Sequence, residues 1–380
     1  MSSNWTAITE FNVYKDPNYT PPPPAGIMGK WGPSIDTPLV PVTAFVDPFS
    51  GQVVLLSSKR HDSFPQDERA YTLTAIWDPI SKELTQGTVE RTKHNMFCPG
   101  LTFDGEGRMI VTGGASGHKT TIFDGAVDDP EFHRQWHSAA EMEIPRGYQS
   151  TVLNADGRML ALGGSWGAHN TMDPATEIKN GELYDPKTDT WTSLSQCRAE
   201  PLWTNDRAQE KIDNHLWLFA WKNDTVIQAG PSKHMNWYTL TGTGGTAPAG
   251  TRTPADGRTD DDAMCGEAVM YDAVAGHIVT FGGASDYDKG GPASNSAFIL
   301  TLGEPNATVV VERVQPMAHN RTYASAIVVP NGEVFVSGGQ HGVPEVFVDK
   351  NPVFEAEMFS PTTSTHEPAL RSPLHLPPSP

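Results

Sequence analysis

The stretch DGEGRMIVTGG, from Asp104 to Gly114, contains the pattern that decides the fold. Its Asp-Gly turn favours the backbone angles of a tight hairpin, and the apolar run that follows is typical of a buried strand. The closing Gly-Gly pair indicates a strand end at which neighbouring backbones approach closely. The stretch therefore predicts a hairpin that leads into a buried inner strand.

The same order of turn, apolar strand and small residues recurs six times, at a spacing of roughly 50 to 65 residues. The copies are DPFSGQVVLLSS from Asp47, DGEGRMIVTGG from Asp104, ADGRMLALGG from Ala155, KNDTVIQAGP from Lys222, DAVAGHIVTFGG from Asp272 and PNGEVFVSGG from Pro330. Repeats of this length are typical of kelch-type β-propellers. We expect an all-β, kelch-type propeller, and the alternative is a β-sandwich with coincidental Gly-Gly pairs.

Composition narrows the function classes. The chain has 380 residues and a net charge of −18, which argues against nucleic acid as a partner. Its apolar runs are too short to cross a membrane, and its first residues do not read as a signal peptide. The three cysteines are far apart in the sequence, which argues against a disulfide framework and leaves a thiol for other chemistry.

Cys98, Tyr148 and Trp166 fall at corresponding places in consecutive repeats, close to Gly-rich strand ends. Taken singly, a cysteine or tyrosine here is more often a packed core residue, and a loop tryptophan more often marks a binding surface. Consecutive blades of a propeller place equivalent residues side by side around the axis. A thiol and a phenol in contact can be oxidised to a thioether, which makes the phenol easier to oxidise to a radical, and a stacked indole can shield it.

The chain resembles the galactose oxidase family of copper radical oxidases. The resemblance extends over roughly residues 30 to 360 and is carried by KWGPSIDTPLVP, KHNMFCPG, RGYQS, LGGSWG, DNHLWLFAWK, QAGPSKHMNWY, DAMCGEAVMYDAV, TFGGASDYD and SGGQ. It implies a thioether-linked radical cofactor of Cys98 and Tyr148, with Tyr148 also a copper ligand and Trp166 stacked over the sulfur. It further implies oxidation of a primary alcohol to an aldehyde while O₂ is reduced to H₂O₂.

The resemblance also implies an alcohol pocket lined by the aromatic residues Phe64, Tyr287 and Phe347. Lys211 falls where the family has the arginine that reads galactose, in a loop that is one residue shorter. A lysine does not offer two sugar hydroxyls the bidentate fork of an arginine. This difference weakens the expectation of a preference for galactose. We expect the substrate to be a primary alcohol, either galactose or another carbohydrate, or a simpler aryl or aliphatic alcohol. Alternatively, each of these aromatic residues packs at the rim of the propeller and does not bind the substrate.

The family's copper also requires two histidines and an axial tyrosine, which come from a seventh blade and from a following domain. The sequence matches neither motif, so we expect about six of seven blades. We divide the chain into an extension over 1–29 without clear structure, an incomplete catalytic propeller over 30–362 and an aberrant Pro-rich tail over 363–380. The tail is hypothesised to result from a frameshift or mis-splicing. The resemblance implies an extracellular location, and the alternative function is a non-catalytic kelch propeller that binds a protein or glycan.

Overall fold

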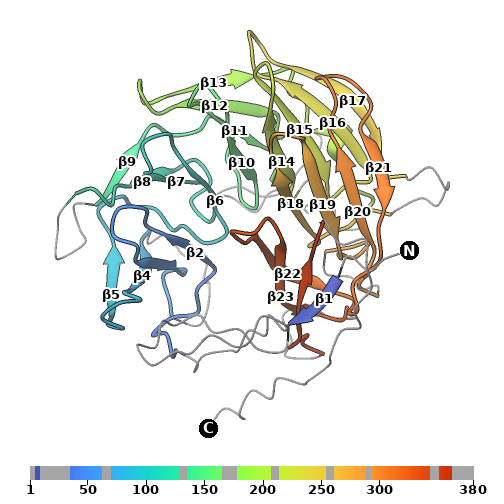
Figure 1. The fold of residues 1–380 in the computed structure, drawn as a ribbon. Coiled ribbons are helices and arrows are strands. Elements are labelled where there is room, and N and C mark those ends of the chain that lie inside the picture. The colour runs from blue at the N-terminus through green and yellow to red at the C-terminus, as the bar shows by residue number, and fades with distance from the viewer. Residues whose placement is uncertain are drawn as a thin grey trace.

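The computed structural model describes residues 5–8, 35–61, 70–127, 135–164, 178–206, 214–253, 261–287, 292–342 and 351–361. Within these ranges the chain forms strands and a single 3₁₀ turn, η1 (Glu200–Leu202). The all-β prediction is confirmed, and the strands form six four-stranded antiparallel sheets arranged as the blades of a propeller (Figure 1). No helix in the described ranges is long and apolar enough to cross a membrane.

The first three blades follow one another in chain order. The first blade consists of β2 (Thr43–Val46), β3 (Val53–Leu56), β4 (Thr72–Trp77) and β5 (Leu84–Val89). The second consists of β6 (Gly100–Phe103), β7 (Met109–Thr112), β8 (Thr120–Phe123) and β9 (Trp136–Ala139). The third consists of β10 (Ser150–Leu153), β11 (Met159–Leu162), β12 (Gly181–Asp185) and β13 (Thr190–Leu194).

The remaining blades continue in the same order. The fourth consists of β14 (Trp217–Trp221), β15 (Thr225–Gly230), β16 (His234–Thr239) and β17 (Gly245–Thr251). The fifth consists of β18 (Glu267–Asp272), β19 (His277–Phe281), β20 (Ala297–Thr301) and β21 (Val310–Arg313). The sixth consists of β22 (Thr322–Val328), β23 (Val334–Gln340), β24 (Ala356–Phe359) and β1 (Trp5–Ile8).

The sixth blade joins the two ends of the chain. Its fourth strand is β1, which pairs antiparallel with β24 so that Trp5 lies opposite Phe359. This strand lies within the segment 1–29, for which the sequence indicates no clear structure. The sixth blade therefore depends on a pairing between residues from opposite ends of the sequence.

The hairpin predicted from DGEGRMIVTGG is present. β6 and β7 pair so that Phe103 lies opposite Met109, and Gly107 in the turn has a φ of +83°. At the far end of β7, a Cβ added to Gly114 would lie 2.5 Å from the carbonyl oxygen of Phe97. The Gly-Gly pair is thus required because the loop before β6 crosses close to the end of β7.

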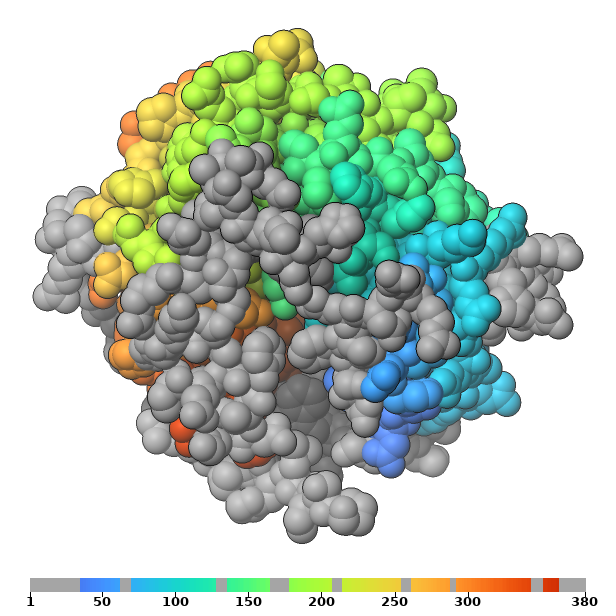
Figure 2. Space-filling model, turned by 180° about the vertical axis from the view of Figure 1, so that it is seen from behind, coloured from blue at the N-terminus to red at the C-terminus, as the bar shows by residue number. Residues whose placement is uncertain are grey.

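The blades surround a central axis, and the first strand of each lies nearest to it. Successive blades approach through β6 and β10, β10 and β14, β14 and β18, and β18 and β22. Figure 1 shows these strands converging on the centre, and Figure 2, from behind, shows the chain running around the molecule in blade order. Residues just before each first strand are thereby brought to one end of the axis.

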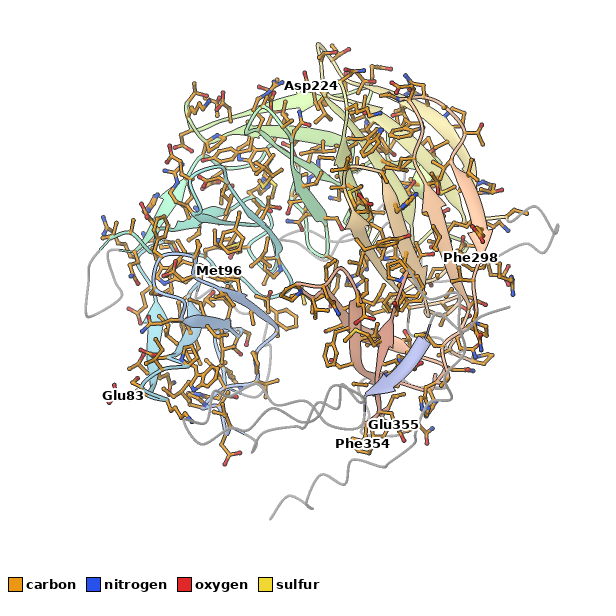
Figure 3. The ribbon with its side chains drawn as sticks, viewed as in Figure 1. Glu83, Met96, Asp224, Phe298, Phe354 and Glu355 are labelled. Atoms are coloured by element: carbon orange, nitrogen blue, oxygen red, sulfur yellow. The ribbon has the colours of Figure 1, made fainter. Side chains whose placement is uncertain are left out.

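Apolar clusters hold neighbouring blades together. One such cluster, between the first and second blades, includes Val54, Met96, Val111 and Trp136. Figure 3 shows Met96, which is fully buried, between the first and second blades, whereas Glu83 lies at the outer rim. Similar clusters join each later blade to the next, as far as the sixth. The packing between sheet faces, rather than the hydrogen bonds within them, therefore sets the order of the ring.

The first and sixth blades differ from the rest. In the described ranges, no apolar cluster contains residues of both blades. A further cluster in the first blade consists of residues of that blade and of the segment before it. Val40, Val42 and Val46 in and beside β2 are exposed by 59%, 39% and 54%, and Ile327 in β22 is exposed by 63%. Apolar side chains of both blades therefore remain in contact with solvent.

A buried ion pair links the loop before β10 to the third blade. The Arg146 guanidinium lies 2.8 Å from a carboxylate oxygen of Glu182, and both side chains are at most 1% exposed. Arg146 also donates to the carbonyl oxygens of Gly163 and Lys179, at 2.9 and 3.0 Å. The same arrangement recurs in the sixth blade with Arg321 and Glu357, again at 2.8 Å. These arginines connect strand ends that would otherwise leave carbonyl groups unpaired.

We expect Arg146→Ala to reduce the free energy of unfolding by about 3–5 kcal/mol, because it leaves the Glu182 carboxylate buried without its cation. Urea unfolding at neutral pH measures the change. The matched control is Lys222→Ala, since Lys222 and Glu304 form an exposed pair. That control should cost less than about 1 kcal/mol. Equal losses in the two variants would contradict a structural role for the buried pair.

We expect His94 to make the protein sensitive to acid. Its buried ring is bonded to Thr121 and to the carbonyl oxygen of Gly113, and burial lowers its pKa to about 4. Because the unfolded chain binds this proton more tightly, stability should be lost as the pH falls from about 6.5 through about 4, by up to about 3 kcal/mol. Urea midpoints at pH 7 and pH 4.5 measure the loss. His94→Asn should lower stability at pH 7 but flatten the pH dependence, and an unchanged slope would contradict this assignment.

Candidate active site at one end of the axis

The candidate site is built from one residue in each of five consecutive blades. Four of them precede the first strand of their blade by two residues, and the fifth is the second residue of β22; all have a left-handed backbone conformation although none is glycine. The five are Cys98 (φ +58°), Tyr148 (+62°), His215 (+54°), Cys265 (+54°) and Tyr323 (+57°). Such angles are uncommon for residues with a Cβ and cluster at functional sites. The repeat therefore holds five chemically active side chains in one conformation around the axis.

Backbone hydrogen bonds connect these residues from blade to blade. The N–H of Tyr148 donates to the carbonyl oxygen of Cys98 at 3.1 Å, and the N–H of His215 donates to that of Tyr148 at 3.2 Å. The N–H of Tyr323 donates to the carbonyl oxygen of Cys265 at 2.8 Å. Because each bond joins equivalent residues of neighbouring blades, these residues are held next to one another at one end of the axis.

Cys98 and Tyr148 are in direct contact. Their side chains are hydrogen-bonded to each other, and the Tyr148 hydroxyl is also hydrogen-bonded to Tyr287. Burial raises the pKa of the Cys98 thiol to about 12, and burial beside Cys98 and Tyr287 raises the pKa of the Tyr148 phenol far above its usual range. Both groups are therefore protonated at neutral pH unless a cation is placed beside them.

Aromatic rings surround the Tyr148 phenol. The His215 ring lies 5.1 Å from that of Tyr148 and stacks on that of Tyr287, at 5.4 Å with an interplanar angle of 6°. Burial lowers the pKa of His215 to about 4, and among the described residues its Nε2 has no hydrogen-bond partner. The loop that holds Tyr287 is fixed by a hydrogen bond from the Tyr287 N–H to Asp206, at 2.7 Å. The site thus contains a neutral imidazole with a free donor or acceptor atom.

Tyr323 extends the site toward a cavity. Its hydroxyl donates to the carbonyl oxygen of Tyr287 at 2.5 Å, and the two rings meet edge to face at 6.0 Å. A cavity of about 310 Å³ lies beside it, lined by Tyr323, Gly339, Gln340 and Pro352. This volume is at the lower end of the range for small-molecule sites.

The structure brings together three of the residues selected from the sequence, namely Cys98, Tyr148 and Tyr287. The other four, Phe64, Trp166, Lys211 and Phe347, lie outside the described residues, so their roles stay predictions. In the described part of the chain, no group of three or more His, Cys, Asp or Glu side chains is placed to hold a metal ion.

His215 and Tyr323 also belong to the site, although neither is among the residues predicted from the sequence. For Tyr323 a signal was present, because Tyr323 precedes Gly332 by the same interval that separates Tyr148 from Gly157 in its hairpin turn. His215 lies in DNHLWLFAWK, and it precedes β14 by the same step that separates Cys98 from β6. Aligning every blade on its inner strand would have selected both residues.

Fold and site together define a kelch-type β-propeller with a thiol–phenol pair at one end of its axis. The Kelch motif model matches residues 146–198. Two galactose oxidase sequences of Gibberella zeae are each 43% identical to this chain over 364 residues, which cover 95% of the chain. The chain spans about half the length of these curated relatives, 51% of each.

A solved structure of a fungal alcohol oxidase, described as having catalytic diversity among the AA5 family and as being in complex with copper, is also similar. It is 39% identical, superposes with a TM-score of 0.81, and the match covers 91% of this chain and 68% of that one. The chain belongs to the AA5 family, the family of that oxidase. The resemblance to galactose oxidases noted in the sequence is thereby confirmed.

We expect the Cys98 thiol of metal-free protein, kept under argon, to react very slowly with iodoacetamide. With a pKa of about 12, its thiolate fraction at pH 8 is on the order of a thousandfold below that of an unfolded cysteine. Timed alkylation followed by peptide mass spectrometry measures the rate in buffer and in urea. Cys197, which is fully buried, is the internal control and should also react slowly until the chain unfolds in urea. Rapid labelling of native Cys98 would contradict the assigned burial.

Proposed function

We propose that this chain is a copper radical alcohol oxidase, which converts a primary alcohol and O₂ into an aldehyde and H₂O₂. The observation that carries the proposal is the contact between Cys98 and Tyr148 at one end of the propeller axis. Membership of the family, and the copper of its fungal alcohol oxidase, support the same chemistry.

The residues fit the organic half of such a site. The thiol of Cys98 is hydrogen-bonded to the phenol of Tyr148, so the sulfur is within reach of the ring carbon beside the hydroxyl. One hydrogen from the thiol and one from the ring carbon pass to O₂, which becomes H₂O₂, and a thioether bond joins the two side chains. We propose that this thioether is the radical cofactor and that the Trp166 indole shields it.

Copper fits this site in part. Tyr148 would hold it through the phenolate oxygen, and a bound Cu²⁺ would supply a one-electron acceptor beside the phenol. The unpartnered Nε2 of His215 is a nitrogen donor close to that phenol. The two histidines and the axial tyrosine that the resemblance implies have no matching motif in this sequence. Among the described residues, the site offers the Tyr148 phenolate and the His215 nitrogen, which are fewer ligands than a transition metal usually takes.

The chain's own residues prepare the phenol for this role. Burial among Cys98, Tyr287 and His215 removes water from the Tyr148 ring, so the phenol stays protonated until a cation offsets its charge. The hydrogen bonds to Cys98 and Tyr287 keep the hydroxyl in one orientation. The ring of aromatic groups also excludes water from a tyrosyl radical, which would otherwise be quenched.

The proposed substrate is a primary alcohol, either galactose or another carbohydrate, or a simpler aryl or aliphatic alcohol. Tyr287 lies in the site, and Phe64, Lys211 and Phe347 are proposed to complete the pocket around it. The cavity beside Tyr323 offers space for a small molecule next to this cluster. A net charge of −18 favours uncharged partners over nucleic acid. By family resemblance we propose an extracellular monomer that does not associate with membranes.

A specific observation favours a second function, that of a non-catalytic kelch propeller. Within the described ranges no three metal-binding side chains converge, while Val40, Val46 and Ile327 expose apolar surface on the first and sixth blades. Such a protein would bind a protein or glycan partner and need no copper. Tight copper binding with turnover of an alcohol would exclude this alternative.

We expect copper and air to join Cys98 to Tyr148. The full chain is prepared without metal under argon and then exposed to Cu²⁺ and air, reduced, and digested with trypsin. The peptides 94–108 and 147–158 should appear as one species that is two hydrogens lighter than their sum. H₂O₂ production from galactose and from benzyl alcohol is measured alongside.

The control variant is Cys98→Ser, which should leave the two peptides separate and abolish H₂O₂ production. A wild-type protein that binds Cu²⁺ but keeps an alkylatable Cys98 thiol would count against the oxidase proposal. Turnover by Cys98→Ser at the wild-type rate would do the same, because the thioether would then be dispensable.

A further inference from the structure

A second cysteine and a second tyrosine repeat the arrangement of Cys98 and Tyr148. Tyr323 has in the sixth blade the position of Tyr148 in the third, as its interval to the hairpin glycine shows. The repeat extends to the buried arginines, since Arg146 and Arg321 each stand two residues before the tyrosine. The two tyrosines are therefore equivalent by the internal symmetry of the propeller.

Cys265 stands in the fifth blade where Cys98 stands in the second. Each cysteine precedes the first strand of its blade by two residues, and each is followed in the next blade by one of the two tyrosines. The φ angles of Cys265 and Tyr323 are +54° and +57°, against +58° and +62° for the first pair. The tyrosine N–H donates to the cysteine carbonyl oxygen in both pairs, at 2.8 Å here and at 3.1 Å there. The backbone relation of the two pairs is thus the same.

The surroundings of the second pair suit oxidative chemistry. Cys265 is 7% exposed and belongs to an apolar cluster with Met264 and Tyr287, against which Tyr323 packs. Tyr323 also lines the cavity of about 310 Å³, through which O₂ can reach it. Cys197 differs, because its thiol donates to the carbonyl oxygens of Thr239 and Gly245 and has no tyrosine at the corresponding place. It therefore serves as an internal negative control.

We propose that Cys265 and Tyr323 form a second thioether cross-link, between the fifth and sixth blades. A bond forms between the Cys265 sulfur and the Tyr323 ring carbon beside the hydroxyl, while the S–H bond and the ring C–H bond break. The two electrons and two protons released pass to O₂, which becomes H₂O₂. The Tyr323 ring already packs against the apolar cluster that contains Cys265, and bond formation requires its hydroxyl to leave the carbonyl oxygen of Tyr287.

This cross-link would act as a covalent staple. It closes a loop that contains all of the fifth blade after Cys265, which restricts the unfolded chain more than the folded one. It also ties the sixth blade, which contains β1, to the rest of the ring. Cys265 and Tyr323 are not members of the proposed radical pair of Cys98 and Tyr148, so the two cross-links can be tested separately.

The test uses the full chain treated with Cu²⁺ and air, then reduced with dithiothreitol, alkylated in urea and digested with trypsin. The peptides 259–289 and 322–350 each contain one member of the pair, and Tyr323 is the only tyrosine of its peptide. We expect a joined species two hydrogens lighter than their sum, with fragmentation placing the bond on Tyr323. The linked protein should also unfold at a higher urea concentration than the unlinked one.

Matched variants separate the two links. Cys265→Ser and Tyr323→Phe should each abolish the 259–289/322–350 species and leave the species that joins Cys98 to Tyr148 intact. Cys98→Ser should do the reverse. Quantitative alkylation of Cys265 after Cu²⁺ and air would overturn the second link, and so would persistence of the joined species in Tyr323→Phe. Absence of the first link alone would count against the oxidase proposal and leave this one standing.

Discussion

The site depends on a backbone hydrogen bond that crosses from one blade to the next. In it, a residue with a left-handed conformation donates its N–H to the equivalent residue of the preceding blade, as Tyr148 does to Cys98 and Tyr323 to Cys265. A positive φ costs a residue with a Cβ on the order of 1 kcal/mol, so the conformation persists only where neighbours fix it. Here the ends of the inner strands fix it. The strain and the bond together place reactive side chains at one end of the axis.

Much of the fold could be predicted from the sequence because its signal is local. Asp-Gly turns, short apolar runs and Gly-Gly ends recur at each inner strand, and each pattern involves residues close together in the chain. The pairing of β1 with β24 has no such signal, because it joins segments from opposite ends of the sequence. The repeat predicts the order of the blades. It does not predict that a strand pairs with another strand far away in the sequence, as β1 does with β24.

The site was predictable to the extent that the repeat places residues side by side. Cys98 and Tyr148 could be paired because they occupy the same position in consecutive blades. His215 and Tyr323 occupy that position too. Their side chains indicate a functional site only when their contacts with a neighbour, here Tyr287, are known. Tyr287 comes from a loop beyond the fifth blade's second strand, and only the folded structure shows that it bridges the third and sixth blades.

The strand β1 has a consequence for the time course of folding. It is the outer strand of the last blade, so it must wait until β24 has been synthesised before it can pair. The five blades before the sixth contain only strands from adjacent segments and can assemble in the order of translation. Closure of a loop that spans almost the whole chain comes last and carries its own entropic cost. The strand β1 is therefore synthesised before the other strands of the propeller and is among the last to pair.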